Sequence, residues 1–109
     1  MHVSIDALEA YLYHHYGERG NEQSLFMKLV EEMGELAEVL NKRAGRKAVE
    51  VDDLQAQLGE ELADLIHYAV SIAAINHIDL TKTILEKDKR ASVKYQRDVN
   101  LETFIGNSV

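Results

Sequence analysis

Apolar residues recur at spacings of three and four along almost the whole chain of 109 residues. This period places them on one face of an α-helix, whereas a half-buried strand alternates at every second residue. The chain has no proline, which would interrupt a helix, and only six glycines. The pattern therefore predicts an all-α chain with four main helices.

Residues that cap or stop helices set the expected boundaries. The four expected helices run from Ser4 to about Gly17, from residues 21–24 to about Ala44 with Gly45 as the stop, from Asp52 or Asp53 to about His77, and from Asp79 to residues 95–97. A basic cluster lies at the near side of the loop that follows the second helix, and its members are Lys42, Arg43, Arg46 and Lys47. The tail, residues 98–109, is weakly patterned, although Leu101, Phe104 and Ile105 can pack on the body or on a partner.

The third predicted helix is apolar around most of its circumference. Its apolar residues are Leu54, Leu58, Leu62, Ala63, Leu65, Ile66, Ala69, Val70, Ile72, Ala73 and Ile75. A helix of this kind is usually buried on several sides, and a small bundle can achieve that by pairing with another copy. We therefore expect a four-helix bundle-like protomer that associates into a dimer or a dimer of dimers.

Length and composition narrow the class of protein. A chain of this length forms one domain, here residues 1–109. No secretory signal and no apolar run long enough to span a membrane is visible, and the absence of cysteine fits the cytoplasm. The net charge of −7 argues against nucleic-acid binding, which needs clustered basic residues. It is compatible with a phosphorylated substrate if divalent cations occupy an acidic site.

Two acidic pairs interrupt the apolar pattern, in the segments LVEEMGELAEV and LGEELADL. With about 100° of rotation per residue, Glu32 lies roughly 80° from the centre of its apolar stripe, whereas Glu61 lies within about 20° of Leu54. Glu35 and Asp64 follow three residues later, so each pair places two like charges side by side. Burying such pairs is costly unless protons or cations neutralise them.

Hard divalent cations supply that neutralisation, because Mg²⁺ prefers carboxylate, water and phosphate oxygens as ligands. The spacing of the acids on two adjacent helices predicts a Mg²⁺ site, with Mn²⁺ as a substitute. The competing interpretation is a set of buried ion pairs from the acids to Lys28, Lys87 or Arg90. The same three residues are the candidates for binding a phosphate group.

Residues 23–95 resemble the MazG-like all-α nucleoside triphosphate pyrophosphohydrolases. The resemblance rests on the segments KLVEEMGELAEVLNKRAGR and LGEELADLIHYAVSIAAINHIDL, followed by a basic fourth helix. It implies that Glu32, Glu35, Glu61 and Asp64 are the metal ligands and the catalytic residues. It further implies metal-dependent cleavage of a nucleoside triphosphate to the monophosphate and pyrophosphate, a housekeeping role in the nucleotide pool, and assembly from dimers.

Three other interpretations compete with this one. The phosphoribosyl-ATP pyrophosphatases share the architecture and the acidic clusters. A non-catalytic helical module would use the acidic face or the apolar third helix to bind a partner, although Glu61 then has no reason to lie among apolar residues. Di-iron chemistry is disfavoured, because ferritin-like sites need two Glu-x-x-His motifs and His67 after Asp64 is the one comparable histidine.

Overall fold

The computed structural model describes residues 1–45 and 53–107, and every regular element in these ranges is helical. The elements are α1 (Ile5–Tyr16), the 3₁₀ turn η1 (Gly17–Arg19), α2 (Glu22–Arg43), α3 (Leu54–Ile75), α4 (Leu80–Lys94) and α5 (Leu101–Asn107). The predicted all-α class is confirmed. Arg46 and Lys47 of the predicted basic loop, and Asp52 as the alternative start of the third helix, lie outside the described residues.

Side-chain caps begin the four long helices at the predicted residues. The side chains of Ser4, Asn21, Asp53 and Asp79 each accept a hydrogen bond from the backbone N–H three residues later. Each bond satisfies a donor of the first turn that has no partner inside the helix. The helix starts are therefore decided by local chemistry that can be read from the sequence.

Within the described residues, a positive φ angle follows each of the four long helices, at Gly17, Gly45, His77 and Gln96. The predicted stops Gly17 and Gly45 have φ values of 50° and 76°, which glycine adopts without strain because it has no Cβ atom. The helix α3 ends two residues before the predicted His77. His77 has a φ of 56°, and the N–H of Ile78 donates to the carbonyl of Ala73 at 3.0 Å. This turn closes α3 and allows the chain to change direction before α4.

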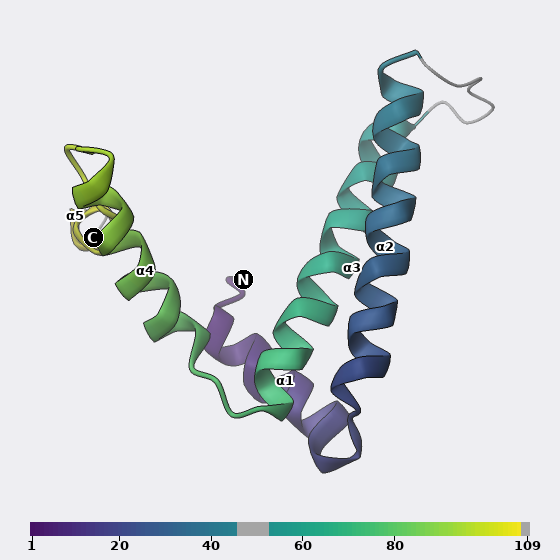
Figure 1. Cartoon of the computed structure of the whole chain (residues 1–109), viewed down its shortest axis with the longest axis horizontal. Coiled ribbons are helices and arrows are strands. Elements are labelled where there is room, and N and C mark those ends of the chain that lie inside the picture. Colours follow the sequence, from purple (N-terminus) through teal and green to yellow (C-terminus); the bar gives the residue numbers. More distant parts are fainter. Residues whose placement is uncertain (46–52, 108–109) are drawn as a thin grey trace.

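The helices α2 and α3 pack side by side as a long antiparallel hairpin, and α1 crosses the C-terminal part of α3 (Figure 1). The fully buried Leu12 of α1 packs there against Val70 and Ala74. The buried apolar residues of the described chain are Leu12, Leu25, Val39, Val70, Ala73 and Ala74, which is a small core. Within the described ranges, no helix has the length and apolar character needed to cross a membrane.

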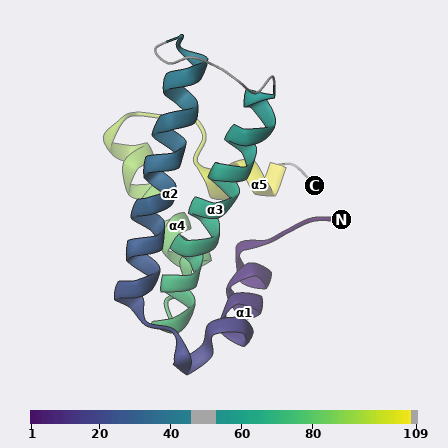
Figure 2. The same ribbon diagram turned by 90° about the vertical axis from the view of Figure 1, so that its right-hand side faces the viewer.

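The helix α4 starts at the base of the hairpin and diverges from it, so that the chain has the shape of a V (Figures 1 and 2). Hydrogen bonds from α4 to α1 hold this joint: the Leu80 N–H donates to Glu9 Oε1 at 2.8 Å, and the Thr81 hydroxyl donates to Asp6 at 2.6 Å. The radius of gyration is 17.0 Å, whereas a compact domain of this length has about 13 Å. The four long helices therefore do not close into one bundle within a single chain.

The tail contains a short helix, α5, that its weak apolar pattern did not reveal. The Leu101 N–H donates to Asp88 of α4 at 2.7 Å, and the Asn100 side chain accepts from the backbone N–H three residues later. Leu101 is partly buried, whereas Phe104 and Ile105 stay 63% and 53% exposed. The hydrogen bond to Asp88 thus anchors the start of α5. A contact with a residue outside the helix cannot be recognised from the sequence pattern of the helix itself.

Candidate metal centre

Three carboxylates from α2 and α3 converge on one place on the hairpin. Glu32, Glu61 and Asp64 each offer an oxygen, and these oxygens all lie within 4.8 Å of one another. Glu32 and Glu61 are half-buried, and Asp64 is exposed. Glu35, which shares a face with Glu32, lies close enough to raise the pKa of both Glu32 and Glu61. The structure thus brings three of the four predicted acids together as oxygen ligands suited to a hard divalent cation, with Glu35 beside them.

The chemistry of two buried oxygens fits a cation. The Oε2 atoms of Glu32 and Glu61 are buried and have no hydrogen-bond partner among the described residues. Burial is the largest cause of the raised pKa of Glu32, which reaches about 7, and the nearby Glu61, Glu35 and Asp64 raise it further. Burial also raises the pKa of Glu61. Buried oxygens are rarely left without a partner in proteins, so these two point to an ion that would satisfy both.

The raised pKa of Glu32 predicts a pH dependence of the metal-free protein. In the unfolded chain this group has a pKa of about 4.5, so between pH 4.5 and 7 the folded state binds more protons than the unfolded state. Stability is then lost as the pH rises through this window. In EDTA, Glu32→Gln should melt at a higher temperature than the wild type at pH 8, and this advantage should shrink toward pH 5. Thermal unfolding followed by circular dichroism measures the difference, with the exposed Glu31→Gln as the control; an advantage independent of pH would contradict the prediction.

The basic candidates do not lie among the four acids. Lys28 forms an ion pair with Glu31, with 3.4 Å between Lys28 Nζ and Glu31 Oε2, and both side chains are exposed. Lys87 and Arg90 are exposed on α4, and neither forms an ion pair with a carboxylate of the described residues. The interpretation of the acids as partners in buried ion pairs with these three residues is therefore wrong for a single chain.

A groove of about 560 Å³ adjoins the acidic cluster, and Glu35 and Glu61 contribute to its wall. Lys42 and Gln57 line the same groove, together with Glu38. Lys42, which belongs to the predicted basic cluster, lies in the last turn of α2, within the predicted bounds of the second helix. Gln57 was not among the predicted site residues. Its position one turn before Glu61, on the same face of the helix, was the signal that could have indicated it.

His67 belongs to an aromatic contact rather than to the carboxylate cluster. Its Nε2 atom lies 2.8 Å from the hydroxyl of Tyr16. The ring of Tyr68 packs edge-on against it with 4.9 Å between the ring centres. The candidate metal group found among the described residues consists of carboxylates alone, so the geometry does not favour a di-iron site with histidine ligands.

Comparisons with known proteins show the family to which this chain belongs. The model of the MazG nucleotide pyrophosphohydrolase domain matches residues 20–96. The rat (Rattus norvegicus) protein dCTP pyrophosphatase 1 is 36% identical over 69 residues, which cover 60% of this chain and 40% of that protein. The chain thus spans less than half the length of this curated relative.

A solved structure is similar over most of the chain. The crystal structure of iMazG from Vibrio DAT 722 superposes with a TM-score of 0.65 at 30% sequence identity, covering 87% of this chain and 100% of the other. The region matched by the family model contains both acidic pairs and the whole hairpin that carries them. The chain therefore belongs to the MazG nucleotide pyrophosphohydrolase domain family.

Proposed function

We propose that this protein is a Mg²⁺-dependent nucleoside triphosphate pyrophosphohydrolase, which cleaves ribo- or deoxyribonucleoside triphosphates to the monophosphate and pyrophosphate. The observation that carries the proposal is the convergence of Glu32, Glu61 and Asp64, with two buried oxygens that lack a hydrogen-bond partner among the described residues. Family membership supports the reaction class. The proposal includes a housekeeping role in the cytoplasmic nucleotide pool, which the resemblance to this family implies.

The side chains of Glu32, Glu61 and Asp64 would hold the metal, with Glu35 as the fourth acidic neighbour. A bound divalent cation offsets the charge of the triphosphate and lowers the pKa of a water molecule. Mg²⁺ fits the all-oxygen ligands, and Mn²⁺ would substitute for it. The ligands come from two helices that pack side by side, and a site built on helices is held more precisely than one built on loops.

The groove beside the acids offers room for the phosphate chain. Glu31 and Glu38 line it, whereas Glu60 does not, so the first two are the better candidates for orienting the attacking water. Lys28 lies one turn before Glu32, but its ion pair with Glu31 competes with phosphate binding. Lys42 is half-buried and lies in the groove itself. We therefore assign phosphate binding within one chain to Lys42 ahead of Lys28.

This assignment predicts the effect of Lys42→Gln. Loss of one charge-assisted hydrogen bond to phosphate should raise KM about tenfold with little change in kcat. The neighbouring Arg43 is exposed and does not line the groove, so Arg43→Gln should leave KM unchanged and serves as the matched control. Steady-state kinetics with a fixed excess of Mg²⁺ measures both. Equal KM values for the two variants would show that Lys42 is only a surface charge.

The reaction class is tested by identifying products in ¹⁸O-labelled water. The purified protein is incubated with a panel of ribo- and deoxyribonucleoside triphosphates, with Mg²⁺ or with EDTA. The rat relative acts on dCTP according to its name, so dCTP is the first substrate to test. We expect monophosphate plus pyrophosphate with Mg²⁺ only. Label in the monophosphate would show attack at the α-phosphorus, and label in the pyrophosphate would show attack at the β-phosphorus.

Two outcomes of the panel would redirect the proposal. Absence of turnover on every nucleoside triphosphate, together with Mg²⁺ binding, would favour the phosphoribosyl-ATP pyrophosphatase reaction, which shares the architecture. Absence of both turnover and metal binding would favour a non-catalytic helical module. The buried carboxylate oxygens argue against a non-catalytic module. Binding of a partner protein does not require acidic side chains that are half-buried between α2 and α3.

A further inference from the structure

The helix α2 contains a glycine, Gly34, well inside its length. Glycine in a helix interior lowers stability relative to alanine, because it loses more backbone freedom on folding. The positive φ angles that favour glycine occur at Gly17 and Gly45, whereas Gly34 has the ordinary backbone of a helix. The backbone conformation therefore does not require glycine at this position, and the reason for it must lie in the space beside the helix.

Close packing against a neighbouring element is one reason for a glycine, and Gly20 illustrates it. A Cβ atom at Gly20 would lie 2.8 Å from Cγ2 of Ile75, which is too close. A Cβ atom at Gly34 would have no described atom within 4 Å, apart from its chain neighbours and the backbone of its own helix. Packing within the described chain therefore does not explain Gly34.

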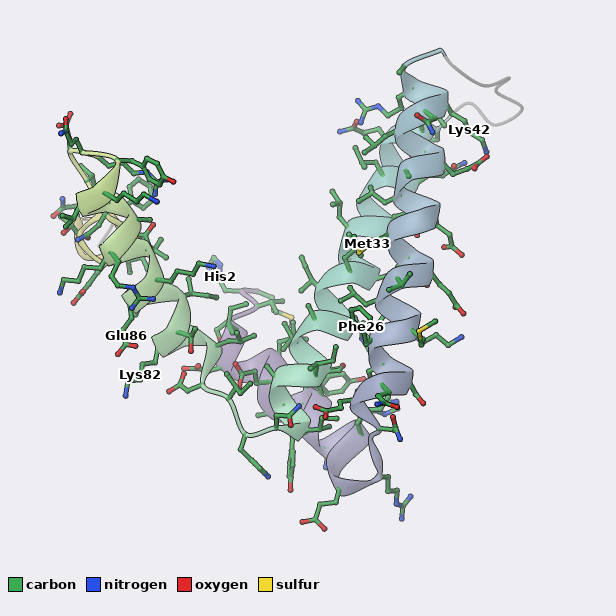
Figure 3. The ribbon with its side chains drawn as sticks, viewed as in Figure 1. His2, Phe26, Met33, Lys42, Lys82 and Glu86 are labelled. Carbon is green, nitrogen blue, oxygen red and sulfur yellow. The ribbon has the colours of Figure 1, made fainter. Side chains whose placement is uncertain are left out.

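Gly34 belongs to the wall of the acidic groove. The groove has a volume of about 560 Å³ and is lined by residues of α2 and α3. Figure 3 shows Lys42, another residue of this wall, on the side of the hairpin that faces away from α4. Because Gly34 has no side chain, the backbone of α2 borders the groove directly at this point. A ligand in the groove can approach the helix more closely here than at any residue with a side chain.

The level of Gly34 along α2 indicates which part of a substrate lies beside it. Gly34 precedes Glu35, and both Glu35 and Glu61 line the groove next to the acidic cluster. Lys42, the proposed phosphate-binding residue, follows eight residues later, about 12 Å along the helix axis. A phosphate chain that reaches from the metal toward Lys42 starts at the level of Gly34. The atoms beside Gly34 are then metal-bound phosphate oxygens rather than the base.

We infer that Gly34 is a positioning residue of the proposed site, which lets the metal-bound phosphate chain lie against the backbone of α2. A side chain at this position would occupy the place of the phosphate oxygens. The chain thus retains a residue that weakens its longest acidic helix because the substrate needs the space. This inference rests on the proposed function and assigns to Gly34 a role that is independent of the base.

Two substitutions of increasing size test the inference. Alanine and leucine both favour helices, so Gly34→Ala and Gly34→Leu should melt about 4 °C above the wild type in EDTA. The added methyl group of alanine should lower kcat/KM about tenfold, and leucine should lower it further, because the enlarged wall displaces the phosphate chain. The factor should be the same for every nucleoside triphosphate. Circular dichroism and steady-state kinetics measure the two effects.

Gly59 of α3 provides the matched control. It also lies inside a long helix, and a Cβ atom there would likewise have no described atom within 4 Å. It precedes Glu61 by two residues, so it points about 160° away from Glu61 around the helix axis, and it does not line the groove. Gly59→Ala and Gly59→Leu should therefore raise the melting temperature as at Gly34 and keep the wild-type kcat/KM.

Four results would overturn the inference. Wild-type kcat/KM in Gly34→Leu would show that no substrate atom lies near this position. A lower melting temperature of both Gly34 variants would show that Gly34 serves packing. Equal losses of kcat/KM with alanine and leucine would indicate that flexibility of the helix, rather than space, is needed. A loss confined to one base would place the base beside Gly34.

A binding experiment without turnover separates this inference from the proposed function. Mn²⁺ alone is titrated by calorimetry, and tripolyphosphate is then added while the melting temperature is measured. Gly34→Leu should bind Mn²⁺ like the wild type, because its acids are unchanged, and should lose the rise in melting temperature that tripolyphosphate causes. Gly59→Leu should keep both. This result would support the inference even if the wild type hydrolysed no nucleoside triphosphate. A tripolyphosphate-dependent rise that persists in Gly34→Leu, or that is absent from the wild type, would contradict it.

Discussion

Replacement of Glu61 by glutamine is expected to lower kcat by about 10³-fold or more, while the helical fold is retained. Glu61 offers one of the three oxygens that converge within 4.8 Å, and its Oε2 atom is buried. Glutamine keeps the volume but removes the negative charge that a divalent cation needs as a ligand. Single-turnover and steady-state kinetics with saturating Mg²⁺ measure the effect, and circular dichroism checks the helical content.

The stability of the same variant separates a role in metal binding from a role in folding. Burial raises the pKa of Glu61, so the charged form is disfavoured in the folded protein. Without metal at pH 8, Glu61→Gln should therefore melt at or above the temperature of the wild type. The adjacent Glu60 is exposed and outside the cluster, which makes Glu60→Gln the matched control with nearly full activity. Full turnover by Glu61→Gln would rule out Glu61 as a metal ligand.

Removal of metal is expected to have the second largest effect, because it acts on both activity and stability. EDTA should abolish turnover, and a saturating excess of Mg²⁺ should raise the melting temperature. A ligand at about 100 times its Kd that binds only the folded state stabilises by about 2.7 kcal/mol. For a domain of this size, that corresponds to a rise in Tm of about 10 °C.

Three controls define this experiment. The protein concentration is held constant, because association of subunits also changes the melting temperature. The Mg²⁺-dependent rise should disappear in Glu61→Gln and in Asp64→Asn, and it should remain in Glu60→Gln. Potassium at equal ionic strength should not reproduce it. Equal melting temperatures of the wild type in Mg²⁺ and in EDTA would show that the acidic cluster does not bind the metal.

The helix starts illustrate what could be predicted from the sequence. A cap such as Ser4 or Asp79 bonds to a backbone N–H three residues away, so its effect is contained in one turn. The rotation of residues along a helix likewise placed Glu32 and Glu61 at the edge of, or inside, the apolar stripes, and the structure brings their carboxylates together. Helical periodicity was sufficient because both acids lie on helices that pack along their full length.

Other features had no local signal. The helix α5 is anchored by Asp88, which is 13 residues away from its bonding partner Leu101. Lys42 and Gln57 share a groove only because α2 and α3 run side by side. The position of α4 depends on hydrogen bonds to Asp6 and Glu9, which lie more than 70 residues earlier. Each of these features depends on contacts between residues that are far apart in the sequence.

Spacings within a few turns of one helix were enough to predict the helical class, the capped helix starts and the candidate set of four acids. The folded chain was needed to see that three of these carboxylates converge and that Lys28 pairs with Glu31. It also shows that α4, the helix that contains Lys87 and Arg90, diverges from the hairpin. The physical reason is that burial and electrostatic interaction depend on distance in space. In this chain, the packing of α2 on α3 and the joint between α1 and α4 set those distances.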